Sequence, residues 1–303
     1  MAWSTPRTDQ GGSSRDWLDA VGLSPVMART SGSPEIRTAL IDGPVDVYHP
    51  DLSAENIHVI PGPLRGACFD AGSVACMHGT FVAGVLVARR GSVAPAICPG
   101  CSLLVRPIFS ERTPDGEIIP GASAEQVADA IVEVTNARAR IINLSLALAG
   151  PLSKEEVLLE QALDHALRRG VVIIAAAGNQ STIGSSVITR HPGVIPVVAY
   201  SSTGQPMASS NLGASIGRRG LGAPGDKITS LGVGAGSQTM GGTSVATPFV
   251  TGAAALLWSD FPTAPAAEIK SAITEAAGSR RRTIAPPLLN ARAAYERLSR
   301  NLR

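Results

Sequence analysis

Long apolar runs are missing from this 303-residue sequence. Runs such as Val171 to Ala177 are far shorter than the roughly 18 residues that a membrane-spanning helix needs. The first fourteen residues, MAWSTPRTDQGGSS, also lack the apolar core and cleavage site of a secretory signal. We therefore expect no membrane partner and a cytoplasmic location, with secretion as the alternative.

An excess of charge of one sign is missing as well. The sequence has 26 Lys and Arg against 24 Asp and Glu, a formal net charge of +2. This balance gives no electrostatic basis for binding nucleic acid. Charged residues make up only 17% of the chain and apolar residues 44%, which excludes a disordered chain and predicts a large core.

Cysteine is scarce, with four residues at Cys68, Cys76, Cys98 and Cys101. They allow three disulfide pairings, and free thiols or one loop disulfide are the simplest interpretation. A four-thiolate zinc site needs two closely spaced pairs, and only the C-x-x-C of Cys98 and Cys101 has that spacing. A thioredoxin-like redox role needs this motif to open a helix, which the flanking sequence does not indicate. We expect neither a metal nor a cofactor.

Short apolar segments alternate with helical patterns along most of the chain. This alternation predicts an α/β fold of three layers, in which helices cover both faces of a mostly parallel sheet. Residues 1–35 form an N-terminal extension with a short helix, and residues 36–303 form one domain. Strands are expected at 36–41, 103–109, 141–144, 171–177 and 195–199, and helices at 16–21, 78–88, 124–137, 154–169, 244–258, 265–277 and 291–299.

Three polar residues stand where a parallel sheet places its chemistry, at the carboxyl ends of strands and the starts of helices. Asp42 ends the first strand, His78 opens a helix, and Ser244 lies at the glycine-rich start of another. Each alone is an ordinary turn or cap residue. Together, the order Asp, His, Ser is one of the known chain orders of a hydrolytic triad.

The residue types fit that chemistry. A serine hydroxyl needs a nearby base, histidine can take its proton near neutral pH, and a carboxylate fixes the tautomer of the histidine. The start of a helix adds free N–H groups and a positive dipole end beside the developing oxyanion. Asn179, which follows a buried strand in Ala175-Ala176-Ala177-Gly178-Asn179, can add its side-chain amide.

These segments resemble the signatures of the subtilisin-like serine proteases, the subtilases. The resemblance runs from about residue 22 to the last helix and implies a subtilisin-like fold for residues 36–303. By position, it makes Asp42 the triad acid, His78 the base, Ser244 the nucleophile and Asn179 the oxyanion donor. It also implies that one segment pairs with extended substrate and another walls the main specificity pocket. These substrate-binding residues are Ser145, Leu146, Ala147, Ala175, Ala176, Ala177 and Gly178.

One subgroup is particularly similar, the proteases that mature cyanobactin-type ribosomal peptides. The similar stretches are Asp42-Gly43-Pro44-Val45-Asp46, Arg106-Pro107-Ile108-Phe109 and the lead-in that begins at Gly22. The resemblance implies a serine endopeptidase that processes a precursor peptide. A general degradative subtilase, a peptide macrocyclase and an inactive peptide-binding relative are the alternatives. The short interval from Asp42 to His78 leaves little room for the capping insert of a macrocyclase.

The sequence also departs from the family. Phe81 stands where most subtilases have a second histidine, and Ala147 replaces a common glycine. The stretch Arg89-Arg90-Gly91-Ser92-Val93 is shorter than the calcium-binding loop of relatives and has no carboxylate. We therefore expect no calcium clamp at this position.

Overall fold

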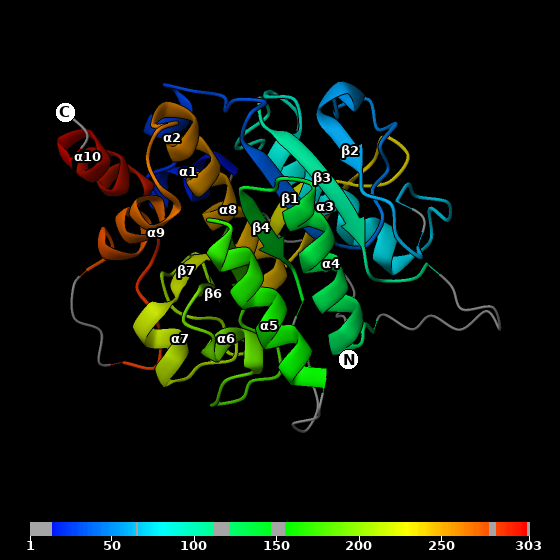
Figure 1. Cartoon of the computed structure of the whole chain (residues 1–303). Helices are drawn as coiled ribbons and strands as arrows, with labels where there is room; N and C mark the ends of the chain where they lie inside the picture. The colour runs from blue at the N-terminus through cyan, green and yellow to red at the C-terminus, as the bar shows by residue number, and fades with distance from the viewer. Residues whose placement is uncertain (1–13, 65, 112–120, 147–154, 279–282, 302–303) are drawn as a thin grey trace.

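The computed structural model describes residues 14–64, 66–111, 121–146, 155–278 and 283–301. Seven strands form one sheet in the order β2-β3-β1-β4-β5-β6-β7, with every adjacent pair parallel. The strands are β1 Arg37–Asp42, β2 Ile57–Val59, β3 Ser102–Pro107, β4 Ile141–Leu144, β5 Val172–Ala176, β6 Val194–Tyr200 and β7 Leu221–Pro224. Helices lie on both faces of the sheet (Figure 1), so the predicted three-layer α/β architecture is confirmed.

Ten α-helices, the short 3-10 helix η1 Ala54–Asn56 and a two-stranded antiparallel hairpin complete the described structure. The hairpin strands are β8 Ile228–Leu231 and β9 Ser237–Met240. The helices are α1 Ser14–Ala20, α2 Ser24–Met27, α3 Val74–Val87, α4 Ala124–Asn136, α5 Glu155–Arg168, α6 Val187–Arg190, α7 Ala214–Arg219, α8 Thr243–Asp260, α9 Ala266–Glu275 and α10 Ala291–Asn301.

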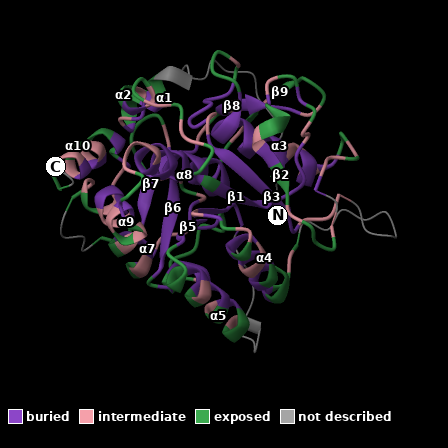
Figure 2. Cartoon of the chain, turned by 45° about the horizontal axis from the view of Figure 1, so that its top comes forward, coloured by how far each residue is buried: buried purple, intermediate pink, exposed green. Residues whose placement is uncertain are grey.

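Two large apolar clusters fill the layers between the sheet and its helices. On one face, α4 and α5 contribute residues such as Ile131 and Leu163. On the other face, α3 and α8 contribute Phe81 and Phe249, and this larger cluster also takes in Trp17 of α1. Figure 2 shows the sheet buried between helices whose outer faces are exposed. The N-terminal helix is thus part of the main core.

Helix α8 is buried along almost its whole length because its sequence is apolar or small on every side. It packs across β4, β5, β6 and β7. At Gly252, a Cβ would lie 2.5 Å from the side chain of Ile97, so only glycine allows this close approach. The helix is therefore held rigidly in the core, and its first turn meets the carboxyl ends of the strands.

Helix α3 begins earlier than the sequence pattern indicates. The expectation that His78 opens the helix is wrong, because α3 starts at Val74. Ser73 is the N-cap, and its hydroxyl accepts the backbone N–H of Cys76. His78 therefore lies in the second turn of α3 and not at its start. In α4, Ser123 and Gln126 form a capping box at the start of the helix.

The glycine- and serine-rich stretch 200–242 contains more regular structure than its composition indicates. It holds α7, the edge strand β7 and the hairpin β8–β9. Both hairpin strands have four residues, and β9 is polar throughout except for Met240. Such short strands carry no long apolar run, so periodicity gives no signal for them.

Candidate functional site

Asp42, His78 and Ser244 meet at the carboxyl end of the sheet, although they come from three separate elements. Asp42 Oδ1 lies 2.7 Å from His78 Nδ1. His78 Nε2 lies 2.9 Å from Ser244 Oγ. All three side chains are buried. The two hydrogen bonds form a continuous chain from the carboxylate through the imidazole to the serine hydroxyl. A serine that is activated by a neighbouring histidine needs such a chain.

Asp42 is the last residue of the central strand β1 and is fully buried. Its Oδ1 accepts the backbone N–H of Gly43 at 2.6 Å as well as the bond from His78. A Cβ at Gly43 would overlap the carbonyl oxygen of Ala75 in α3. Because Gly43 has no side chain, α3, which carries His78, can lie close to the end of β1, which carries Asp42.

A second glycine, Gly79 of α3, also allows the helix to lie close to the loop after Asp42. A Cβ at Gly79 would overlap the carbonyl oxygens of Gly43 and Pro44. The backbone N–H of Asp46 donates to Thr80 Oγ1 at 2.9 Å, which ties the same loop to α3. His78 is thus held against Asp42 by packing of backbone on backbone, with little freedom to move.

The surroundings of His78 raise the pKa of its imidazole, although burial alone would lower it. Burial lowers the pKa of His78, but the charge of Asp42 and the hydrogen bond to it outweigh burial. The pKa of His78 therefore lies above its ordinary value of 6.5. A base of this kind accepts a proton readily and still releases it to a leaving group.

Ser244 is the second residue of α8, as the glycine-rich sequence before it predicts. The N-cap, Gly242, has φ +124°, a conformation that favours glycine. A Cβ there would also crowd the side-chain amide of Asn179 at 3.0 Å. The backbone N–H of Ser244 belongs to the first turn, where no preceding carbonyl of the helix is available to accept it.

Asn179 lies beside that turn, just beyond the end of β5. Its Oδ1 accepts the N–H of Thr243 at 2.9 Å and the hydroxyl of Thr243 at 3.1 Å. Because an N–H can only donate, the carbonyl of the Asn179 amide must face Thr243. Thr243 Oγ1 also accepts the N–H of Gly178 at 3.1 Å. The Asn179 amide therefore presents its NH₂ group away from Thr243, which holds the amide by two bonds to its oxygen.

The predicted substrate-binding residues that are described lie at the ends of two neighbouring strands. Ser145 and Leu146 follow β4, whereas Ala175 and Ala176 end β5. The two strands pair in parallel, with Leu144 opposite Ala175. The remaining residues of the second segment, Ala177 and Gly178, are also buried, and Ala147 lies outside the described residues.

Three further residues support the site, and the sequence pattern did not identify them: Asn143, Thr251 and Thr243. Asn143, fully buried in β4, donates to Ser145 Oγ at 2.6 Å and accepts the hydroxyl of Thr251 at 2.8 Å. Thr243 orients Asn179, as described above. A polar residue inside the apolar strand Ile141-Ile142-Asn143-Leu144 is the signal that identifies such a position, because a buried amide needs partners.

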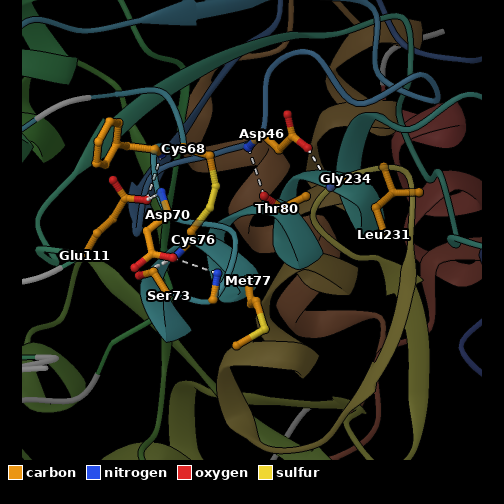
Figure 3. Close-up of a disulfide and its surroundings, with 12 residues drawn as sticks. Asp46, Cys68, Asp70, Ser73, Cys76, Met77, Thr80, Glu111, Leu231 and Gly234 are labelled. Carbon is orange, nitrogen blue, oxygen red and sulfur yellow. Dashed lines mark hydrogen bonds between the residues drawn. A yellow bond between two sulfur atoms is a disulfide. The ribbon is translucent and has the colours of Figure 1, made fainter.

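The cysteines do not form a four-thiolate zinc site. Cys68 and Cys76 are joined by a disulfide with 5.5 Å between their Cα atoms (Figure 3). Cys98 and Cys101 are buried free thiols. Among the described residues, the one group of metal-ligating type contains both disulfide sulfurs and Glu111, so its thiolates are not available to a metal.

None of the described helices combines the length and the apolar composition needed to cross a bilayer. This agrees with the absence of long apolar runs in the sequence.

Two comparisons with solved structures give close similarity over nearly the whole chain. A mutant form of the protease domain of PatA superimposes with a TM-score of 0.80 at 30% identity, covering 89% of this chain and 97% of that one. The Prenylagaramide maturation protease PagA superimposes with a TM-score of 0.79 at 28% identity, covering 91% and 98%.

Sequence comparison gives the same group of proteins. Subtilisin NAT from Bacillus subtilis subsp. natto is 30% identical over 248 residues, which is 80% of this chain. The chain spans 60% of the length of that relative. The model of the Subtilase family, Peptidase S8, matches residues 34–300. With the fold, the strand-end geometry and this match in agreement, the chain belongs to the subtilase family.

Proposed function

We propose that this chain is a serine endopeptidase that processes a ribosomally made precursor peptide. Ser244 is the nucleophile, His78 the general base and acid, and Asp42 the carboxylate that orients it. The observation that carries the proposal is the unbroken pair of hydrogen bonds from Asp42 through His78 to Ser244, at 2.7 and 2.9 Å. A serine and a histidine in such contact are a base-activated nucleophile.

In the proposed acylation step, Ser244 Oγ bonds to the carbonyl carbon of the substrate while its proton passes to His78 Nε2. The negative charge that develops on the carbonyl oxygen is met by the NH₂ group of Asn179 and the backbone N–H of Ser244. Asp42 stabilises the imidazolium without taking a proton. His78 then gives its proton to the leaving amine, and the C–N bond breaks to leave an acyl-enzyme.

Deacylation reverses these roles with water in place of the amine. His78 takes a proton from water, whose oxygen attacks the ester carbonyl carbon. The same two donors stabilise the second oxyanion, and the proton returns to Ser244 Oγ as the acid product leaves. No residue beyond the four proposed is needed for a complete turnover.

The finer substrate class rests on similarity and on the two strand ends that lie beside the triad. The Prenylagaramide maturation protease PagA is 28% identical to this chain, and the match covers 98% of PagA. The segments that begin at Ser145 and Ala175 offer two neighbouring strand ends, between which an extended peptide can add as a strand. Strand ends of this kind suit an extended, unfolded precursor peptide better than a folded protein.

The test uses the full chain with two substrates, a synthetic copy of any short precursor peptide encoded next to its gene and denatured casein. We expect one or a few cuts in the precursor, read by mass spectrometry, and little cleavage of casein. Ser244→Ala, with an unchanged circular dichroism spectrum, loses both the cleavage and labelling by a fluorophosphonate.

The outcomes separate the alternatives. Casein cut at many sites as fast as the precursor identifies a general degradative protease. A product lighter than the linear fragment by one water identifies a macrocyclase. A folded wild-type chain that does not label at Ser244 contradicts the triad itself.

A further inference from the structure

The hairpin β8–β9 joins the two halves of the candidate site. Its second strand leads through Gly241 and Gly242 directly into the turn that carries Ser244. Its first strand packs against α3, the helix that carries His78. At Gly84 of α3, a Cβ would lie 2.7 Å from Leu231 Cγ, so the contact needs a glycine on the helix. The hairpin is therefore in contact with the helix of the base and continuous with the loop of the nucleophile.

Two side chains of the hairpin donate to main-chain carbonyls of α3. Gln238 Nε2 donates to the carbonyl of Met77 at 2.6 Å. Ser230 Oγ donates to the carbonyl of Phe81 at 2.8 Å. Met77 directly precedes His78, and Phe81 lies one turn further along the same face. The two bonds thus bracket the histidine along the helix.

Gln238 makes a second bond that ties the hairpin to itself. The same Nε2 donates to the carbonyl of Leu231 at 3.1 Å, on the opposite strand. One half-buried amide nitrogen therefore joins β8, β9 and α3. The bond to Met77 therefore does more than stabilise the hairpin, because it joins the hairpin to the residue before His78.

The tip of the hairpin is anchored to the loop that follows Asp42. Asp46 Oδ2 accepts the N–H of Gly234 at 2.9 Å, and Asp46 N–H donates to Thr80 of α3. Figure 3 shows Asp46 bonded to Gly234 on one side and Thr80 on the other. The tip is thus fixed independently of Gln238, whose bond to Met77 reaches the residue that directly precedes His78.

We propose that Gln238 is a positioning residue for the hydrolytic reaction: its amide fixes the main chain at Met77 and so holds His78 in register with Ser244. The inference rests on the triad proposed above and is independent of the substrate. A displacement of the reacting groups by 1 Å can cost about 10²-fold in rate. Loosening by a part of that distance is expected to lower kcat by about tenfold.

The experiment compares three full-length variants. Gln238→Met keeps the length of the side chain and removes its donors, whereas Gln238→Lys keeps a donor. Thr239→Val is the matched control, because among the described residues the hydroxyl of Thr239 bonds to Thr229 of the same hairpin, at 2.8 Å, and not to α3. Each is measured for kcat and KM on a peptide substrate and for the rate of fluorophosphonate labelling.

We expect Gln238→Met to lose about tenfold in both kcat and labelling rate with KM unchanged, Gln238→Lys to recover most of that loss, and Thr239→Val to match wild type. Wild-type rates in Gln238→Met, an equal loss in Thr239→Val, or a change confined to KM each overturn the proposal. If Gln238→Met does not fold, Gln238→Glu replaces it, with donors again absent and the same loss expected. Labelling of wild type, and its loss in Ser244→Ala, tests the triad separately.

Discussion

The side-chain carbonyl of Asn179 accepts the backbone N–H of Thr243, the residue that precedes Ser244, at 2.9 Å. This bond turns the NH₂ group of Asn179 away from Thr243, and we propose that it faces the side on which a substrate carbonyl meets Ser244. It also joins the end of β5 to the start of α8. The position of the proposed oxyanion donor is therefore set by the same turn that presents the nucleophile.

Asn179→Ala is expected to lower kcat by about 10²- to 10³-fold, the loss that follows removal of one such donor in a subtilisin. KM should change little, because the bond forms only in the transition state. Steady-state kinetics on a peptide substrate measure both constants. A variant that keeps wild-type kcat would show that Asn179 is not an oxyanion donor.

Thr243→Val tests how Asn179 is oriented. It removes the hydroxyl that bonds to Asn179 and to Gly178 but keeps the backbone N–H. We expect a smaller loss in kcat than for Asn179→Ala, about tenfold, because one of the two bonds to the amide survives. The same assay measures it. A loss as large as that of Asn179→Ala would mean that the backbone bond alone does not hold the amide.

The pH dependence of kcat/KM reports the protonation of His78, which must be neutral to act as a base. Because the pKa of His78 is raised above 6.5 by Asp42, activity should rise with pH through a midpoint above 6.5. In Asp42→Asn, burial remains and the opposing charge is gone, so the midpoint should fall. A midpoint that is the same in both proteins would contradict the assignment of Asp42 as the cause.

Arg90 is expected to stabilise the chain where the family resemblance would place a calcium clamp. Its guanidinium donates to the carbonyls of Met27 and Thr30 in one segment and of Ile97 in another. Arg90→Met should lower the free energy of unfolding by about 2 kcal/mol. This is less than the full value of three charged hydrogen bonds, because the guanidinium is partly exposed to water. Arg89→Met, which removes one bond to Pro50, is the matched control and should cost less. Chemical denaturation measures both.

Chelator is expected to leave the melting temperature and the activity unchanged. The loop that contains Arg90 has no carboxylate, and a guanidinium already satisfies the surrounding carbonyls. Calcium at 100 times its Kd would add about 2.7 kcal/mol, a shift of several degrees for a chain of this size. Thermal unfolding in millimolar calcium and in excess EDTA makes the comparison. A shift of that size would reveal a cation site.

The parts of the fold that the sequence predicts are those with strong periodicity. Strands such as Ile141 to Leu144 and helices such as α4 are visible because burial forces their apolar pattern. The order of Asp42, His78 and Ser244 likewise predicts which side chains meet. The start of α3 is missed because its cap, Ser73, precedes a sequence with no polar face to mark a first turn.

The supporting contacts are harder to predict because they depend on tertiary register. Gln238 lies in a four-residue strand without an apolar pattern, and nothing in the chain marks Met77 as its partner. The pairing of Cys68 with Cys76 was one of several possibilities that spacing leaves open. Residues of this kind become identifiable only when both partners are placed in space.

The position of α8 has a consequence for synthesis of the chain. Asp42 and His78 are 36 residues apart, but Ser244 follows His78 by 166 residues, and α8 packs across four strands that must already be in place. Contacts so distant in sequence form late and make folding slow. A ribosome-bound chain that ends before α8 has the acid and the base but no nucleophile. The complete proposed triad can therefore form only after the chain has been synthesised as far as α8.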